Sequence, residues 1–123
     1  PCGSGQDYAH CCGPLHDGAP PQGAEHLMRS RYSAYVLGLD DYLLATWHPR
    51  TRPPALTLDQ PRWLGLEVRA HEADGERATV EFVARYKVAG RAHRLHERSR
   101  FVREGVQWFY LDGECPAGTR RPD

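Results

Sequence analysis

Three cysteines near the start of the chain have the residue type and the spacing of a small zinc site. Structural zinc is held by four tetrahedral ligands, which are thiolates or imidazoles. Cys2 opens a glycine-rich tight turn, in which glycine allows backbone N–H groups to point toward a thiolate. Cys11 and Cys12 then bring two further sulfurs back to the same point. The pattern predicts a zinc knuckle over residues 1–18 that binds Zn²⁺ through Cys2, Cys11 and Cys12.

The spacing does not fix the fourth ligand of this knuckle. His10 and His16 are the nearby candidates, and a cysteine preceding Pro1 would also complete the set. Because the chain begins without Met, we expect that first ligand to lie ahead of this sequence, and three ligands would hold zinc less tightly. Two alternatives stay open, since the cysteines could instead form a disulfide or be free thiols. Cys115 stands alone near the other end and predicts no site.

The order of residues in this cluster resembles a known element. The run Cys2-Gly3-Ser4-Gly5, then Tyr8, then Cys11-Cys12 is similar to the SEC-C motif, the small zinc element at the C-terminus of the SecA translocation ATPase. Cys2 matches the second cysteine of that motif, and Cys11 and Cys12 match its closing pair. The resemblance implies bound zinc. Because the motif in SecA contacts a chaperone, it also implies a protein partner for the knuckle.

The charge balance of the chain excludes some classes of partner. Lys and Arg number 16, as do Asp and Glu, so the net charge is zero with His neutral. A nucleic-acid or membrane-surface protein would favour a basic excess, so neither partner is expected. The sequence contains no signal peptide and no apolar run near the length that spans a bilayer. Few cysteines, clustered as a metal site, are typical of a reducing compartment, so we expect a cytoplasmic location.

Periodicity divides the rest of the chain into helices followed by strands. Residues 13–22 are rich in proline and glycine and predict a linker. Apolar residues at intervals of about 100° predict a helix over residues 23–39. A shorter helix over residues 41–47 should be stopped by Pro49. The residues 50–62 that follow are a proline-rich connection with little periodicity.

From Trp63 onward, apolar and polar residues alternate with the period of a strand. Three dipeptides with turn propensity divide this region into four strands: Asp74-Gly75, Ala89-Gly90 and Glu104-Gly105. Two helices followed by such a meander predict an α+β fold, in which N-terminal helices pack in a curved four-stranded antiparallel sheet. This body should span residues 19–115, and residues 116–123 should form a flexible tail. Trp47, Trp63 and Trp108 are expected to fill the core or its rim.

The body also resembles a family of bacterial proteins. Four segments are similar to the signatures of YchJ-like proteins: Leu27 to Tyr35, Thr46 to Pro49, His96 to Phe101, and Trp108 to Gly113. Those proteins carry an N-terminal SEC-C motif and a domain similar to nuclear transport factor 2. That domain is a curved antiparallel sheet wrapped around helices, a cone with a pocket at its open end. The resemblance implies a cone-shaped fold and a metal, but no reaction.

Two charged residues lie where the periodicity calls for apolar ones. Arg31 lies in the apolar stripe of the first long helix, and Glu97 lies on the same strand face as Leu95 and Phe101. A buried charge without a partner is costly, so we expect Arg31 and Glu97 to form an ion pair inside the cone. Tyrosines and Ser99 would satisfy the remaining hydrogen bonds, with His48 at the rim. The predicted pocket comprises Arg31, Tyr32, Tyr35, His48, Tyr86, Glu97 and Ser99.

The same residues could form a structural ion pair, a ligand pocket or a catalytic site. Cone folds of this type host isomerases and dehydratases, for which Glu97 as base and His48 as acid would be the minimal pair. A Glu paired with Arg is a poor base, so a structural ion pair is favoured over a ligand pocket, and a pocket over catalysis.

The leading interpretation is a non-enzymatic cytoplasmic adaptor that binds protein partners through its zinc knuckle and could form a homodimer. The alternative is a small-molecule binder, or an isomerase-like or dehydratase-like enzyme, using the polar pocket. A filled cone would favour the adaptor, and a deep polar cavity would favour the alternative.

Overall fold

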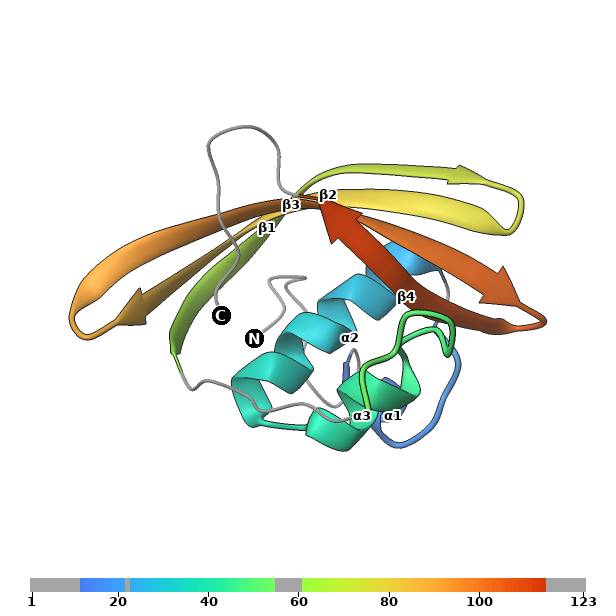
Figure 1. Cartoon of the computed structure of the whole chain (residues 1–123), viewed down its shortest axis with the longest axis horizontal. Coiled ribbons are helices and arrows are strands. Elements are labelled where there is room, and N and C mark those ends of the chain that lie inside the picture. The colour runs from blue at the N-terminus through green and yellow to red at the C-terminus, as the bar shows by residue number, and fades with distance from the viewer. Residues whose placement is uncertain (1–11, 22, 55–60, 115–123) are drawn as a thin grey trace.

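The computed structural model describes residues 12–21, 23–54 and 61–114, which form three helices and four strands. The elements are α1 (Cys12–His16), α2 (Ala24–Leu37), α3 (Asp40–Ala45), β1 (Arg62–Asp74), β2 (Arg77–Val88), β3 (Arg91–Glu104) and β4 (Gln107–Glu114). The helices lie together on one side of the sheet, as Figure 1 shows. The α+β class predicted from the sequence is confirmed. In the described part of the chain, no helix has both the length and the apolar character needed to cross a bilayer.

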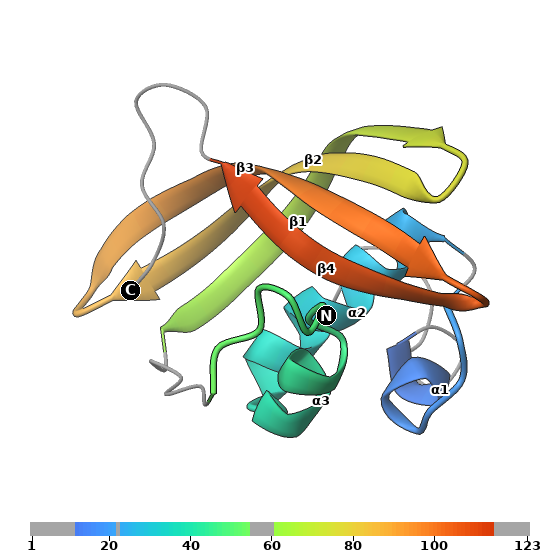
Figure 2. The same ribbon diagram turned by 45° about the vertical axis from the view of Figure 1, so that its right-hand side comes forward.

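The sheet is an antiparallel meander with strand order β1-β2-β3-β4. Its three tight turns fall at the predicted dipeptides, and Gly75, Gly90 and Gly105 adopt φ values of 63°, 79° and 66° there. Glycine is favoured at such positive φ because it has no Cβ to clash. Register shifts interrupt β1 twice and the β3–β4 pairing once. Such irregularities bend strands, and the sheet curves over α2 in both views (Figures 1 and 2).

The core lies between α2 and the inner face of the sheet. Side chains alternate along β2, so Val80, Phe82 and Tyr86 are buried on that face. Phe101 of β3 and Leu27 of α2 are also buried in this cluster. The period-two pattern of the sequence therefore builds one wall of the core, and the helical pattern builds the other.

α1 overlaps the segment that the sequence predicts as a linker, and that prediction is wrong for residues 13–16. Leu15 is only 4% exposed, so this short helix is fixed by burial rather than by propensity. His16 bonds through Nε2 to the carbonyl of Ser30 at 2.8 Å, and its ring packs edge-on against Tyr42. α2 is consequently covered by α1 and α3 on the side opposite the sheet. Ser30 and Ser33, on that side, are both fully buried.

The segment after α3 pairs with strand β4 of the sheet. The sequence predicts a helix as far as Trp47, but α3 ends at Ala45. Tyr110 donates its backbone N–H to the carbonyl of Thr46 at 2.8 Å, and His48 donates its own to the carbonyl of Tyr110 at 2.7 Å. These two bonds form a parallel bridge between Trp47 and Tyr110. Pairing with β4 therefore overrides the helix and places Trp47 beside α2.

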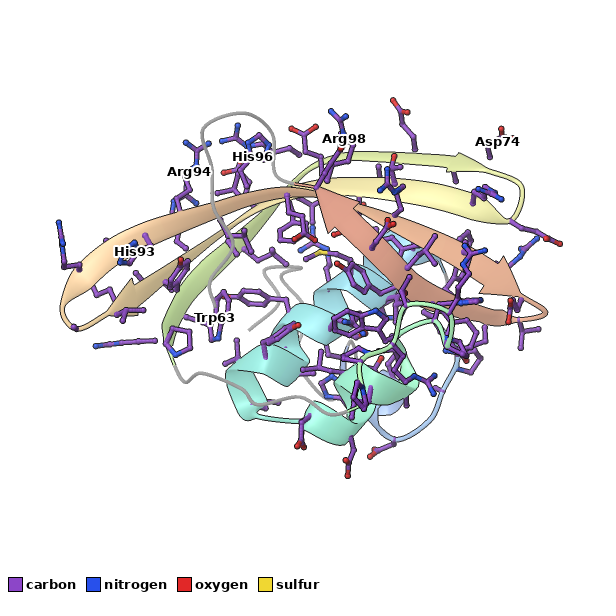
Figure 3. The ribbon with its side chains drawn as sticks, viewed as in Figure 1. Trp63, Asp74, His93, Arg94, His96 and Arg98 are labelled. Carbon is purple, nitrogen blue, oxygen red and sulfur yellow. The ribbon has the colours of Figure 1, made fainter. Side chains whose placement is uncertain are left out.

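The outer face of the sheet carries charged side chains. Arg94, His96 and Arg98 of β3 point away from the helices in Figure 3, whereas Trp63 lies on the helix side. Glu81 of β2 accepts hydrogen bonds from His96 at 2.8 Å and from Arg98 at 3.4 Å. These bonds hold the pKa of the Glu81 carboxyl below its ordinary value. The outer face is thus an ion-pair network, and the polar chemistry of the core must be sought on the inner face.

Candidate functional site

A cavity of about 270 Å³ lies between α2 and the inner face of the sheet. Seven aromatic residues line it: Tyr32, Tyr35, Trp47, Trp63, Phe82, Phe101 and Tyr110. Arg31, Glu97 and Ser99 are its polar lining residues. Ligand pockets are typically apolar and aromatic clefts with a few placed polar groups. This cavity has that composition, at a size suited to a compact molecule.

Arg31 contributes a buried positive charge to the cavity. It is 5% exposed, because α2 presents it toward α3 and β4. Its Nη1 donates to the carbonyl of Leu43 at 2.8 Å and to Thr46 Oγ1 at 2.6 Å. Its Cζ lies 5.4 Å from the centre of the Trp47 ring and 4.6 Å from that of Tyr110. Burial lowers the pKa of the guanidinium, and the neighbouring phenols and Glu97 oppose that shift.

The ion pair expected between Arg31 and Glu97 is not formed. Arg31 bonds to α3 and to Thr46 instead, and none of the ion pairs among the described residues includes it. A carbonyl, a hydroxyl and two aromatic faces hold this guanidinium in place of a carboxylate, and they use only part of its donor set. Both residues nevertheless line the same cavity.

The Glu97 carboxylate is held by its own strand and by β4. Ser99 donates a hydrogen bond to Glu97 Oε2, and both residues are buried. Ser99 is the cross-strand partner of Gly113, whose missing side chain leaves room for the carboxylate. A Cβ placed on Gly113 would lie 2.5 Å from Glu97 Oε2. The carboxylate is therefore fixed by a hydroxyl on one side and by a glycine backbone on the other.

Trp47 brings an unsatisfied donor to the cavity wall. Its indole Nε1 is buried and has no hydrogen-bond partner in the part of the chain that the structure describes. A buried N–H without an acceptor costs free energy, so such a group calls for an explanation. The sequence places Trp47 only in the core or at its rim. Pairing of this segment with β4, which no local pattern reveals, is what turns the indole inward.

Five of the seven predicted pocket residues line the cavity: Arg31, Tyr32, Tyr35, Glu97 and Ser99. Tyr86 does not line it. The centre of its ring lies 5.5 Å from that of Trp63, and the ring stacks on His93 with 5.2 Å between the ring centres. His48 also lies outside, with Nε2 2.9 Å from Glu104 Oε2. Neighbours on an extended segment point to opposite sides, so Trp47 inside places His48 outside. The acid–base pair of Glu97 and His48 is consequently not assembled.

Of the predicted zinc ligands, Cys12 lies within the described residues, whereas Cys2 and Cys11 lie outside them. Cys12 begins α1 and is 1% exposed. Ser33 of α2 donates a hydrogen bond from Oγ to Cys12 Sγ at 3.3 Å. A hydroxyl donor to sulfur is the kind of contact that supports a metal-bound thiolate, so Cys12 fits the role. No group of three potential ligands gathers in residues 12–21, 23–54 and 61–114, so the predicted site depends on the other two cysteines.

Comparison with protein families matches both parts of the chain. Residues 23–113 match the family described as the middle, NTF2-like domain of YchJ. Residues 1–14 match the SEC-C motif. A UPF0225 protein of Methylibium petroleiphilum is 61% identical over 93% of this chain and 88% of its own length. One from Chromobacterium violaceum is 57% identical over 92% and 90%.

Solved structures agree with the fold. A SEC-C motif containing protein from Rhodopseudomonas palustris, solved in solution, has a TM-score of 0.84 and 36% identity, covering 93% of this chain and 95% of that one. The crystal structure of a SEC-C motif containing protein from Psychrobacter arcticus gives a TM-score of 0.76 and 32% identity, covering 96% and 75%. The resemblance drawn from the sequence signatures is thereby confirmed for both the motif and the cone.

Proposed function

This chain belongs to the YchJ family of UPF0225 proteins, and on that premise we propose that its NTF2-like body is a binding module for a small organic molecule. The cavity between α2 and the sheet carries the proposal. Its wall combines aromatic rings with a buried guanidinium and a buried indole N–H that lacks an acceptor. Buried donors are costly unless they are bonded, and a bound ligand would supply the missing acceptor.

Binding is favoured over acid–base catalysis by the placement of the titratable groups. Glu97 is held by Ser99 and packed against Gly113, and His48 bonds to Glu104 outside the cavity. A general base needs a partner and a reacting proton within hydrogen-bond reach. Among the described residues, no second carboxyl group and no histidine joins Glu97 in the cavity wall. The adaptor interpretation called for a filled cone, which the cavity argues against.

The test is a fragment screen by ligand-observed NMR against the whole chain and a cavity-filling variant. Ala84 lines the cavity and is 1% exposed, so Ala84→Leu should fill it and abolish fragment binding. Filling an existing cavity should leave thermal stability nearly unchanged. Ala92→Leu makes the same change at an exposed position and should keep binding. The cavity is not a binding site if no fragment binds the unmodified chain. The same conclusion follows if fragments bind Ala84→Leu as well as they bind Ala92→Leu.

We also propose that Cys2, Cys11 and Cys12 hold Zn²⁺. The SEC-C match over residues 1–14 and the bond from Ser33 Oγ to Cys12 Sγ support this assignment. With a fourth protein ligand, bound zinc would supply a structural cross-link rather than a reaction, because a site closed by four protein ligands leaves no position for substrate. α1 packs on α2, so a metal held at Cys12 would be joined to the body of the cone.

Metal analysis under reducing conditions tests the zinc proposal. The intact protein should carry stoichiometric zinc, and Cys12→Ala should lose most of it. Absence of zinc from the intact protein would overturn the assignment. A protein partner at the motif, and a homodimer of the body, remain predictions from the sequence. A pull-down with and without chelator addresses the partner.

A further inference from the structure

On the premise that the cavity binds a small molecule, we propose that its ligand is a compact monocarboxylate with a planar apolar body. Its carboxylate would be bound by the free edge of the Arg31 guanidinium and, after a small shift of the ring that uncovers it, by the buried indole N–H of Trp47. The Glu97 end of the cavity would exclude a second anionic group. Three features of the described residues carry this choice.

The first feature is the unused edge of Arg31. A guanidinium has five N–H donors, and those of Nη1 are taken by the carbonyl of Leu43 and by Thr46 Oγ1. Neither Leu43 nor Thr46 lines the cavity, so Nη1 is turned away from it. The edge formed by Nε and Nη2 remains for a ligand. Two parallel N–H groups on one edge match the two oxygens of a carboxylate.

The second feature is the excess of donors over acceptors at this end of the cavity. Trp47 lies against the guanidinium, with 5.4 Å between Arg31 Cζ and the ring centre, and its buried Nε1 has no hydrogen-bond partner among the described residues. Within residues 12–21, 23–54 and 61–114, Arg31 takes part in no ion pair, so its buried charge has no counter-ion in contact there. A buried cation is stabilised by an anion that also accepts hydrogen bonds. A ligand carboxylate would meet both needs at once.

The third feature is the rest of the wall, which is apolar and largely aromatic apart from Glu97 and its partner Ser99. Aromatic faces favour a planar apolar body in offset or edge-on contact. A second carboxylate on the ligand would meet the Glu97 carboxylate in an apolar site, where like charges repel strongly. With about 270 Å³ available, near the lower end of ligand pockets, the body should be about one ring.

Titration by ¹H–¹⁵N NMR with four probes tests the ligand class. Phenylacetate is the expected ligand, phenylacetamide is its neutral counterpart, 2-phenylethylamine is the cation, and 1,4-phenylenediacetate carries a second carboxylate. Phenylacetate should bind about 10- to 100-fold more tightly than the other three, which is the range for losing a charge-assisted hydrogen bond. It should also shift the indole N–H resonance of Trp47, assigned from Trp47→Phe.

Two variants separate the roles of the donors. Arg31→Lys keeps the charge but removes the two-donor edge, and it should weaken phenylacetate about 10-fold while leaving phenylacetamide nearly unchanged. Trp47→Phe keeps a ring but removes the N–H, and it should weaken phenylacetate several-fold. Trp108→Phe is the control, because Trp108 lies outside the cavity wall. Thermal unfolding of each variant confirms that it is folded.

The outcomes distinguish the proposal of a carboxylate ligand from the broader proposal that the cavity binds a small molecule. Should phenylacetamide or 2-phenylethylamine bind in the cavity as well as phenylacetate, the carboxylate assignment is wrong and the binding function stands. The assignment would likewise be wrong if Trp47→Phe and Arg31→Lys bound phenylacetate as tightly as the unmodified protein does. If none of the probes binds and the fragment screen also finds nothing, both proposals are wrong.

Discussion

Gly113 of β4 lies against the carboxylate of Glu97 on β3, at a distance that leaves no room for a side chain. A Cβ on Gly113 would be 2.5 Å from Glu97 Oε2 and 2.8 Å from its carboxyl carbon. Gly113 pairs with Ser99 across the strands, and Ser99 donates to the same carboxylate. A side chain at this position would force the Glu97 carboxylate to move. The glycine gives Glu97 a buried position at the edge of the cavity.

Gly113→Ala should displace the Glu97 carboxylate and destabilise the protein. Overpacking at a buried site costs about 1 to 3 kcal/mol of unfolding free energy, which urea denaturation can measure. Gly65→Ala is the matched control, since Gly65 also lies in a strand but has no atom near the position of the new Cβ. Equal stability of the two variants would mean that the Glu97 side chain moves aside at no cost.

Arg31 and Glu97 should show little energetic coupling. Arg31→Met removes the charged donor that the Leu43 carbonyl and Thr46 Oγ1 share, and it should lower the free energy of unfolding by about 1 to 3 kcal/mol. Glu97→Gln keeps the shape of the side chain at the Gly113 contact. A double-mutant cycle should give a coupling below about 1 kcal/mol, because the two side chains are not in contact.

The cycle also tests the ion pair expected from the sequence. Breaking a direct buried pair costs about 3 to 5 kcal/mol, because one charge is left uncompensated. A coupling of that size between Arg31 and Glu97 would restore the ion pair and contradict the arrangement described here. Arg98→Met, on the exposed outer face, controls for the loss of a positive charge and should change stability by less than about 1 kcal/mol.

Ser33→Ala should weaken zinc retention without unfolding the body. Ser33 donates to Cys12 Sγ, and loss of such an outer contact typically costs about 10- to 100-fold in metal affinity. Ser30→Ala is the matched control, because Ser30 is equally buried on α2 but bonds to Leu27 and Tyr42 instead. Competition with a chromophoric chelator measures the affinity. Identical zinc affinity of the two variants would show that Ser33 does not contribute to zinc binding.

Glu81 should make stability fall in acid. Hydrogen bonds from His96 and Arg98 lower the pKa of its carboxyl in the folded protein. The ionised form therefore favours the folded state. Its contribution is present above the unfolded pKa, about 4.3, and is lost as pH falls through the lower folded pKa.

Urea denaturation between about pH 7 and pH 3 can follow this loss. The stability difference between the unmodified protein and Glu81→Gln should be present at neutral pH and should disappear in acid. Glu72→Gln removes the same charge from an exposed site on β1 and should show no such change. A difference that stays constant with pH would exclude Glu81 as the responsible group.

Much of the fold follows from local patterns. The α2 stripe, the four alternating strands and the glycine turns could all be predicted, because each depends on neighbours within a few residues. α1 could not, since its five residues are held by the burial of Leu15 and by the contact of His16 with α2. The end of α3 could not either, because pairing of Trp47 with Tyr110 joins segments more than 60 residues apart.

The sequence by itself determined that Arg31 and Glu97 are buried, because their positions in the apolar pattern leave no other face. It also determined the cone, through the signatures shared with relatives, and the cysteine pattern of the motif. Only the tertiary structure decided the partners of these charges. A guanidinium can be satisfied by a carbonyl, a hydroxyl and two rings as well as by a carboxylate. Which of these it meets depends on how α3 and β4 pack against α2, and that is a property of the assembled chain.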